Sequence, residues 1–336
     1  MEASPEKPTI LVTGGAGYIG SHAVLALRDQ GWPVVVIDNL STGFKWALPA
    51  DVPLVEGNIG DPACVLDTLK TFNVQAIMHF AGSIIVPESV EDPLKYYGNN
   101  TANTRTLLEV AIGAGVPHFL FSSTAATYGT PDKVPIGEDT AKSPINPYGM
   151  SKLMTEIMLA DVARAHPMNY CALRYFNVAG ADPRARSGQS TAGATHLIKV
   201  AVEAALGRRA YVSVFGTDYA TPDGTGVRDY IHVSDLADAH VLALQALIAS
   251  PDQSLIMNCG YGRGFSVNEV LNAVDRVAGV TLERRYEGRR PGDPDALVAD
   301  NRRIMSHLSW QPRYDDLETI VAHALAWERQ LHTRCN

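Results

Sequence analysis

A glycine-rich turn directly after an apolar run is the feature that most restricts how this chain can fold. Ile10–Val12 has the composition of a short buried strand, and Thr13–Gly20 (TGGAGYIG) follows it at once. A helical pattern then continues to about Gln30. Glycines permit a tight turn and let a pyrophosphate approach the backbone, while the first N–H groups of the helix face the phosphates. The arrangement predicts a dinucleotide site.

An acidic residue closes the next apolar run. Val34–Ile37 is continuously apolar and ends in Asp38, about 20 residues beyond the glycine turn. A carboxylate at this place accepts hydrogen bonds from ribose hydroxyls and repels a 2′-phosphate. The pattern therefore favours NAD over NADP as the dinucleotide.

Alternating strand-like and helical segments predict the fold class. Helical stretches separate short apolar runs, which is typical of a parallel sheet with helices on both faces. We therefore predict an α/β fold, a doubly wound parallel sheet of the Rossmann type, with a smaller mixed α/β C-terminal lobe for the substrate. The expected strands are 10–12, 34–37, 53–56, 76–79, 118–122 and 170–174, and the expected helices are 17–30, 92–114, 147–165 and 195–206.

A change of composition marks the expected domain boundary. Residues 180–193 are rich in Gly, Ala, Arg, Ser and Pro, as expected of a connecting loop. We predict an NAD-binding Rossmann domain over residues 8–180 and a substrate-binding lobe over residues 181–336. Segments of the second part, at about 228–250, are expected to pack back on the Rossmann domain.

Composition excludes several classes of partner. The net charge is −8 and 19% of residues are charged, so the chain lacks the concentrated basic surface that nucleic acids require. No apolar run approaches the roughly 20 residues that span a membrane, and the polar Met1–Pro8 does not resemble a signal peptide. Four cysteines without CxxC spacing favour a cytoplasmic protein without a zinc site. Acidic residues between His232 and His240 fit a helix start better than a metal site.

A tyrosine and a lysine four residues apart give the main catalytic signal. Tyr148 and Lys152 begin a predicted helix and so share one face, and the strand before them ends in Ser122-Ser123-Thr124. A free tyrosine has a pKa near 10, and a neighbouring ammonium together with a positive nicotinamide ring favours its phenolate. The sequence therefore predicts a proton-transferring tyrosine beside a nicotinamide, with Thr124 or Ser123 holding the same substrate oxygen.

With these residues in place, the chain resembles the extended short-chain dehydrogenase/reductase family, whose members use a Ser/Thr–Tyr–Lys triad. Further segments narrow the resemblance to the UDP-glucose 4-epimerases of that family. The resemblance covers about residues 8–330, and Asp223–His232 is its most specific block. The other segments are Thr13–Gly20, Asp38-Asn39, His79–Gly82, Pro87–Val90, Tyr96-Tyr97 with Asn99-Asn100, Ser122–Gly129, Pro147–Lys152, Leu173–Asn177 and Arg289–Asp293.

The resemblance implies an isomerase that inverts C4 of a nucleotide hexose, with UDP-glucose and UDP-galactose as substrates and NAD as cofactor. Tyr148 takes the proton of the C4 hydroxyl while hydride leaves C4 for the nicotinamide. The 4-keto sugar then turns over on its anchored UDP, and hydride and proton return to the opposite face. The resemblance also implies a homodimer that assembles through the helices at 93–114 and 147–165.

The same resemblance assigns residues to each ligand. The catalytic residues are Thr124, Tyr148 and Lys152. The residues expected to bind NAD are Gly14, Gly17, Tyr18, Ile19, Gly20, Asp38, Asn39, Asn58, Ile59, Phe80, Ala81, Gly82, Asn99, Ser122, Tyr148, Lys152 and Tyr175. The residues expected to bind the UDP-sugar are Ser123, Thr124, Phe176, Asn177, His196, Leu197, Phe215, Arg228, Arg290, Asp293 and Leu297. No residue is assigned to a metal ion.

Several positions depart from the family pattern. Ile84 stands where a lysine commonly reaches the cofactor, and Asn58 stands where an aspartate often contacts the adenine amino group. His196 stands where an asparagine often meets the UDP phosphates. Leu297 occupies the position that gates sugar size, and leucine is smaller than the tyrosine of familiar members. The sugar therefore stays open among glucose and galactose, N-acetylated hexoses and pentoses.

Three other functions stay open at this point. A dehydratase places an Asp-Glu pair directly after the threonine, whereas Ala125-Ala126 follow Thr124 here. A UDP-pentose or UDP-N-acetylhexosamine 4-epimerase would use the same catalytic residues. A non-catalytic NAD-sensing regulator would have no need of Tyr148 and Lys152. Inversion of UDP-galactose at C4 without added NAD separates these functions.

Overall fold

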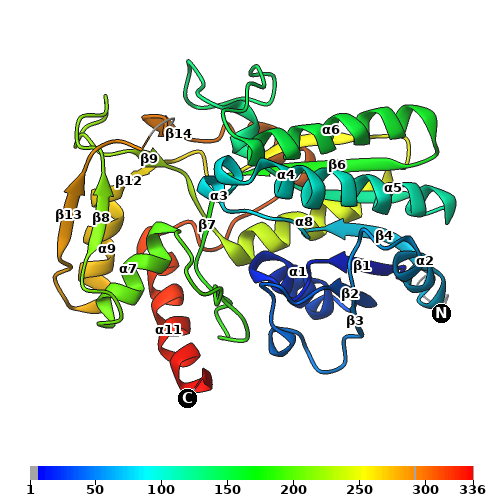
Figure 1. Cartoon of the computed structure of the whole chain (residues 1–336), viewed down its shortest axis with the longest axis horizontal. Helices are drawn as coiled ribbons and strands as arrows, with labels where there is room; N and C mark the ends of the chain where they lie inside the picture. The colour runs from blue at the N-terminus through cyan, green and yellow to red at the C-terminus, as the bar shows by residue number, and fades with distance from the viewer. Residues whose placement is uncertain (1–6, 291–292, 336) are drawn as a thin grey trace. The chain divides into compact units, whose positions relative to one another are not determined.

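Figure 1 shows the computed structural model, which describes residues 7–290 and 293–335. Most of the N-terminal segment and the Pro291-Gly292 pair of the Arg289–Asp293 block lie outside the described residues. Contacts between residues group the chain into two compact units, each made of three separate segments of the sequence. The predicted domains, in contrast, are two continuous stretches that meet at residue 180. The first unit takes in the chain up to Thr127, Asn146–Leu173 and His240–Ile256; the second takes in Tyr128–Ile145, Arg174–Ala239 and the chain from Met257 onward.

A seven-stranded sheet forms the centre of the dinucleotide-binding fold. Its strand order is β11-β6-β5-β4-β1-β2-β3, and the pairings β1–β2, β1–β4, β2–β3 and β4–β5 are all parallel. The order reverses between β1 and β4, which is where a doubly wound sheet binds its ligand. The predicted Rossmann-type fold class is therefore confirmed. The strands are β1 (Thr9–Thr13), β2 (Val34–Asp38), β3 (Leu54–Glu56), β4 (Val74–His79), β5 (His118–Thr124), β6 (Asn169–Tyr175) and β11 (Leu255–Cys259).

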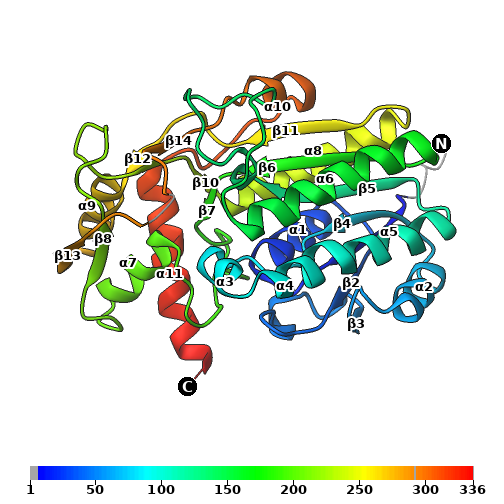
Figure 2. The ribbon, with the colours of Figure 1, turned by 45° about the horizontal axis from the view of Figure 1, so that its top comes forward.

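Helices cover both faces of this sheet because its strands are apolar on both sides. Leu11 and Ile37 point to the face that α2, α5 and α6 cover, and pack with Leu108 and Leu159 of those helices. Helix α1 lies on the opposite face (Figures 1 and 2). The helices and helical turns are α1 (Tyr18–Asp29), a 3₁₀ turn (Lys45–Ala47), α2 (Pro62–Thr71), α3 (Val86–Glu91), α4 (Pro93–Tyr96), α5 (Asn103–Gly113), a 3₁₀ turn (Ala125–Tyr128), α6 (Pro147–Ala165) and α8 (Val233–Ala249).

The helix predicted over residues 92–114 is interrupted. A π-helical turn, Tyr97–Ala102, separates α4 from α5. Apolar periodicity does not reveal a π turn, because the extra residue per turn changes only the direction of the side chains around it. Here the turn carries Asn99 and Asn100, and both reach Ser83.

Helix α6 begins where the sequence places it. Pro147 occupies its first turn, and the side chain of Asn146 caps it by accepting a hydrogen bond from the Gly149 N–H at 2.9 Å. This start fixes Tyr148 and Lys152 on the first two turns, where Tyr148, Ser151 and Lys152 are all buried.

The second unit combines small sheets with a cluster of three helices. Strand β10 pairs in parallel with β7, strand β13 with β8, and β9 lies between β12 and β14. Helices α7, α9 and α11 pack on one another. The elements are β7 (Asn177–Ala179), α7 (Leu197–Ala205), β8 (Val212–Phe215), β9 (Val227–Arg228), β10 (Tyr230–His232), β12 (Phe265–Ser266), α9 (Val267–Ala278), β13 (Arg284–Glu287), β14 (Ala296–Leu297), α10 (Arg302–Leu308) and α11 (Leu317–Cys335).

The described residues contain neither a membrane-spanning helix nor a metal-binding cluster. None of the helices there combines the length and the hydrophobicity that a membrane crossing needs. Within residues 7–290 and 293–335, no three His, Cys, Asp or Glu side chains are grouped so that they could hold a metal ion.

Candidate active site

The glycine turn after β1 contains glycines of two kinds. Gly14 has a φ of +69°, and a Cβ on it would lie 2.6 Å from the Ala81 nitrogen. A Cβ on Gly20 would lie 2.2 Å from the Gly14 carbonyl oxygen. The chain itself therefore requires these two glycines. A Cβ on Gly17 would lie 3.2 Å from the Gly14 carbonyl oxygen, a tight contact that a shift of a few tenths of an ångström would relieve, so packing constrains Gly17 less than Gly14 or Gly20.

The start of α1 tests whether the site fits a dinucleotide. Gly17 is the N-cap of α1, whose first helical residues are Tyr18 and Ile19, and it supplies no side chain to cap the helix. A helix N-terminus that begins with glycine is suited to a pyrophosphate. The residues present therefore fit NAD.

Asp38 is placed at the edge of the same turn. Its Oδ2 accepts a hydrogen bond from the Ala16 N–H at 2.9 Å, and its Oδ1 accepts one from the Leu40 N–H at 2.8 Å. These bonds orient a buried carboxylate whose oxygens each keep a further lone pair for ribose hydroxyls. Asn39, the next predicted residue, is exposed, and its side-chain oxygen accepts from the Ser41 N–H.

An asparagine network links other residues predicted to bind NAD. Asn103 donates to the side-chain oxygens of Asn58 and Asn99, at 3.4 and 3.2 Å. Asn99 in turn donates to the Ser83 hydroxyl at 3.0 Å. Ile59 is buried beside Asn58. The structure thus brings Asn58, Ile59 and Asn99 of this predicted set to one edge of the first unit.

The loop after β4 lies against the glycine turn. The Phe80 N–H donates to the Thr13 carbonyl oxygen at 2.9 Å, and Ala81 is the residue that limits Gly14. A Cβ on Gly82 would lie 3.8 Å from Lys152 Nζ, so Gly82 borders the lysine that is predicted to be catalytic. Ile84 is 52% exposed, so the departure from lysine leaves an apolar side chain at the surface.

Tyr148 and Thr124 form the centre of the predicted catalytic group. The Thr124 hydroxyl lies near the Tyr148 hydroxyl and acts to lower the pKa of the phenol. The Ala126 N–H donates to Thr124 Oγ1 at 3.2 Å, which leaves the Thr124 proton for the tyrosine oxygen. Tyr96 packs edge-on against Tyr148, with ring centroids 6.5 Å apart. Tyr148 is therefore held between a hydroxyl donor and an aromatic wall.

Lys152 lies one turn further along α6 and is buried. Its Nζ donates to the Ser122 carbonyl oxygen at 3.0 Å and lies 4.9 Å from the centroid of the Phe121 ring. Burial lowers the pKa of Lys152 to about 8. At neutral pH the side chain is still an ammonium, because this pKa remains above 7.

Burial governs the electrostatics of Tyr148 in the polypeptide. The sequence predicts that the ammonium and a bound nicotinamide ring together lower the pKa of the phenol. Among the groups of the chain, burial raises the pKa of Tyr148, and only the Thr124 hydroxyl acts in the lowering direction. The physical reason is that removal from water disfavours the phenolate more than the groups of this chain favour it. The polypeptide alone therefore keeps Tyr148 protonated at neutral pH.

Ser123 differs from its neighbour Thr124. It is fully buried, and its hydroxyl donates to Glu156 Oε1, which is buried as well. This bond joins β5 to α6 and directs the Ser123 hydroxyl towards Glu156. Alternation along the strand explains the difference, because successive side chains of β5 point to opposite faces.

In the second unit, the predicted UDP-binding residues centre on an ion pair. Arg228 on β9 pairs with Asp293. Arg290 lies over the Phe215 ring, with its guanidinium carbon 3.8 Å from the ring centroid. Leu297 on β14 is the register partner of Arg228. The structure thus brings two arginines, a carboxylate and the predicted gate of sugar size together around β9 and β8.

Other predicted residues lie at element boundaries of the same unit. His196 is the N-cap of α7 and Leu197 its first residue. Asn177 begins β7, and Tyr175 and Phe176 immediately precede it. These are exposed or half-buried, as residues that meet a ligand can be.

Two residues that the sequence does not single out have central places. Asn100 accepts from the Ser83 N–H at 2.7 Å and donates to the Ser151 hydroxyl at 3.1 Å, which joins the loop after Gly82 to α6. Asp229 is buried in the second unit and accepts three main-chain hydrogen bonds. Both residues lie in segments that carry the family resemblance, and nothing else in the sequence indicates that they are important.

The fold and these residues define a dinucleotide-binding α/β protein with a tyrosine–lysine pair. Comparison with known proteins narrows this class. The NAD dependent epimerase/dehydratase family matches residues 10–260, and the chain belongs to that family.

Individual relatives agree with this assignment. The UDP-glucose 4-epimerase of Azospirillum brasilense is 59% identical over 97% of this chain and 93% of its own length. The UDP-glucose 4-epimerase of Brucella ovis in complex with NAD has a TM-score of 0.92 and 46% identity, over 95% of this chain and 98% of that chain. The UDP-glucose 4-epimerase of Stenotrophomonas maltophila, with bound NAD and formylated UDP-arabinopyranose, has a TM-score of 0.94 and 37% identity, over 98% of this chain and 100% of that chain.

Proposed function

We propose that this chain is an NAD-dependent isomerase that interconverts UDP-glucose and UDP-galactose at C4 through a 4-keto sugar. The buried Tyr148 near the Thr124 hydroxyl, one helical turn before the buried Lys152, is the observation that carries the proposal. Its relatives support the substrate, since the Azospirillum brasilense protein at 59% identity is a UDP-glucose 4-epimerase.

Tyr148 is the acid and base of this proposal. It accepts the proton of the C4 hydroxyl, while Thr124 donates a hydrogen bond that stabilises the phenolate. Bound NAD would supply the nicotinamide ring that accepts hydride from C4 of the sugar. The positive charge of that ring would also favour the phenolate. Tyr148 later returns its proton to the C4 oxygen, so no net oxidation or proton release occurs.

Lys152 contributes a fixed positive charge. It is an ammonium at neutral pH, and its bond to the Ser122 carbonyl oxygen keeps Nζ in place. Because little water screens a buried cation, Lys152 would favour the negative charge that develops around Tyr148 during the reaction. Gly17, Asp38, Asn58 and Asn99 would hold the dinucleotide.

The nucleotide half of the substrate is assigned to residues of the second unit. Arg228 and Arg290 suit the two phosphates, since guanidinium groups form paired hydrogen bonds with phosphate oxygens. Asp293 suits ribose hydroxyls, and Phe215 offers an aromatic face. Leu297, next to Arg228 in register, is assigned to the sugar.

We also propose that the protein is a cytoplasmic homodimer. Met154 and Ile157 of α6 are exposed and lie three residues apart, on one face of the helix, and Leu94 of α4 is 78% exposed. Such apolar residues suit a helix-to-helix interface with a second copy. Light scattering should give twice the mass of the chain, and Ile157→Lys should reduce that mass to the monomer value.

The direct test is C4 inversion of UDP-galactose by the purified protein without added NAD. Formation of UDP-glucose supports the proposal. A 4-keto-6-deoxy product would indicate a dehydratase instead. Absence of any turnover by protein that carries bound cofactor would indicate a non-catalytic NAD-sensing protein. A panel of UDP-pentoses and UDP-N-acetylhexosamines then defines the preferred sugar.

A further inference from the structure

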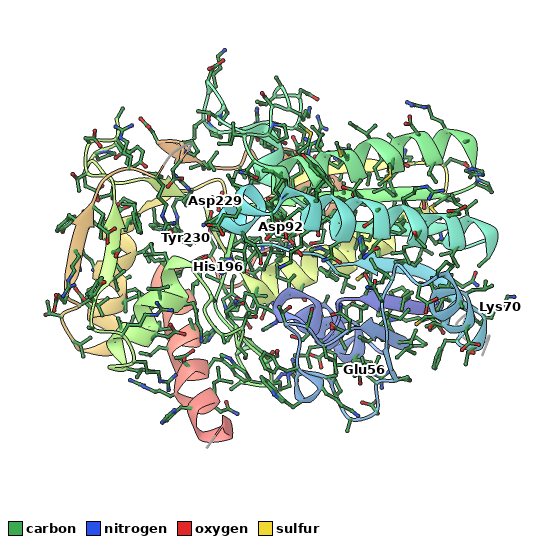
Figure 3. The ribbon with its side chains drawn as sticks, viewed as in Figure 1. Glu56, Lys70, Asp92, His196, Asp229 and Tyr230 are labelled. Carbon is green, nitrogen blue, oxygen red and sulfur yellow. The ribbon has the colours of Figure 1, made fainter. Side chains whose placement is uncertain are left out.

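Asp229 has a buried carboxylate whose hydrogen bonds come from the main chain. Its Oδ1 accepts from the Tyr261 N–H at 3.0 Å, and its Oδ2 accepts from the N–H groups of Gly262 at 3.0 Å and Ala299 at 3.2 Å. The side chain is completely inaccessible to solvent. Figure 3 labels Asp229 and the neighbouring Tyr230 in the second unit. Three main-chain donors on one carboxylate join two separate segments, 261–262 and 299, to one point.

The main chain of Asp229 contacts two residues that the proposed function assigns to the substrate. Its N–H donates to the Leu297 carbonyl oxygen at 3.0 Å, and its carbonyl oxygen accepts from the Asn177 N–H at 3.0 Å. Arg228 is its neighbour in the chain. Asp229 therefore adjoins three of the assigned residues, while the hydrogen bonds of its own side chain go to other segments.

Gly260 shows how closely this position is filled. A Cβ on Gly260 would lie 2.6 Å from Asp229 Oδ2 and 2.8 Å from the Ala299 Cβ. Only glycine leaves room for the carboxylate beside Ala299. Asp229 follows β9 and Ala299 follows β14, so the distance between the ends of these two strands depends on how Gly260 packs against both residues.

We infer that Asp229 is a positioning residue of the nucleotide-sugar site, one that sets the relative places of Asn177, Arg228 and Leu297 without touching the substrate. The inference rests on the proposed function. A shift of β14 against β9 would move Leu297 relative to Arg228, its register partner. Loss of the carboxylate therefore weakens binding of the UDP group more than it changes the chemical step, whose residues Tyr148, Thr124 and Lys152 belong to the first unit.

The same unit offers a matched control in Asp235. Asp235 is also buried and accepts from main-chain N–H groups, those of Arg313 at 3.0 Å and Tyr314 at 2.9 Å, together with the Tyr261 hydroxyl at 2.6 Å. Two of its hydrogen bonds hold the segment before α11, and the third holds the hydroxyl end of Tyr261; none of these partners is assigned to the substrate. A general loss of stability would follow from either aspartate, whereas a loss of UDP affinity is expected only from Asp229.

The experiment compares Asp229→Asn with Asp235→Asn in the full chain. The amide introduced by Asp229→Asn would direct its own N–H donors at main-chain N–H donors. We therefore expect the Kd for UDP by calorimetry and the KM for UDP-galactose to rise about tenfold, with kcat within about twofold. For Asp235→Asn we expect a lower Tm and a UDP Kd within about twofold of wild type. Gly260→Ala should weaken UDP binding as Asp229→Asn does, and Gly137→Ala, where a Cβ meets nothing within 4 Å, should not.

Two results would overturn the inference. One is a UDP Kd in folded Asp229→Asn equal to that of wild type. The other is an equal loss of UDP affinity in Asp235→Asn, which would make the effect general. Failure of the proposed function is recognised separately, because it would appear as wild-type protein that does not invert UDP-galactose at C4.

Discussion

Lys152 Nζ donates a hydrogen bond to the carbonyl oxygen of Ser122, with the two atoms 3.0 Å apart. Ser122 lies two residues before Thr124 on β5, and Lys152 lies one turn after Tyr148 on α6. The bond therefore fixes the turn that carries the tyrosine against the strand that carries its hydroxyl partner. It does so with a buried cation, which is costly for the fold.

Lys152→Met should make the protein more stable and less active. Because burial lowers the pKa of Lys152 from 10.5 to about 8, the folded state binds fewer protons than the unfolded state between those pH values, and stability from this group rises with pH. At pH 7 the buried ammonium costs at most about 3 kcal/mol. In cofactor-free protein we expect the free energy of unfolding to rise by roughly 1–3 kcal/mol, while kcat falls at least about 100-fold.

Chemical denaturation and a coupled epimerase assay measure the two effects. Lys95→Met serves as the control, since Lys95 is half exposed and pairs with Glu88 at the surface. It should change stability by less than about 0.5 kcal/mol and leave kcat unaltered. A Lys152→Met protein that is both less stable and fully active would contradict this account of Lys152.

Gly17→Ala should remove bound NAD without unfolding the protein. A Cβ at Gly17 would lie 3.2 Å from the Gly14 oxygen, which a shift of a few tenths of an ångström relieves, whereas a Cβ at Gly20 would lie 2.2 Å from it. We expect Gly17→Ala to fold with wild-type circular dichroism and at least about tenfold less NAD, and Gly20→Ala to fold poorly. Gly113→Ala, with open space around its Cβ, should match wild type in NAD content. Full NAD retention in Gly17→Ala would show that the space at Gly17 does not serve the cofactor.

Ser123 and Thr124 should separate into a structural and a catalytic hydroxyl. Ser123→Ala removes one hydrogen-bond donor from the buried Glu156, so stability should fall by about 1–3 kcal/mol while kcat stays within about threefold. Thr124→Ala removes the hydroxyl near Tyr148, so kcat should fall at least about tenfold with a smaller change in stability. Urea unfolding measures the stability and steady-state kinetics measure kcat. A large loss of kcat in Ser123→Ala with little loss in Thr124→Ala would contradict these two roles.

Asp229 should leave a signature in the pH dependence of stability. Burial raises the pKa of Asp229 to about 6, so between about pH 4 and 6 the folded state binds more protons than the unfolded state. The contribution of this group to stability is therefore larger below about pH 4 and is lost as the pH rises through 6, by about 3 kcal/mol. The free energy of unfolding of wild type and of Asp229→Asn is measured at about pH 4.5 and 7.5. The difference between the two proteins in their change with pH gives the contribution of the Asp229 carboxyl. Parallel pH profiles would show that the carboxylate is not perturbed.

The sequence predicts the first unit well because its signals are local. The apolar runs, the glycine turn and Pro147 each act within a few residues, and β1, β2, α1 and α6 form where those signals stand. The π turn at Tyr97–Ala102 escapes such reasoning, because no composition distinguishes it from an α-helix.

The second unit is less predictable for a physical reason. Strands β9 and β14 have two residues each and pair only through contacts that are distant in sequence. Asp229 gains its place from main-chain N–H groups of Tyr261, Gly262 and Ala299, which no local pattern connects to it. The raised pKa of Tyr148 likewise depends on burial that only the three-dimensional structure reveals.

The central claim is that Tyr148 moves the proton of the C4 hydroxyl. Its most direct measurement is the rate of UDP-galactose inversion by Tyr148→Phe, in protein whose bound NAD has been verified by absorbance. Phenylalanine keeps the ring that packs against Tyr96 and lacks only the hydroxyl. We expect a fall in kcat of at least about 100-fold with unchanged NAD content. Wild-type kcat in that variant would contradict the account.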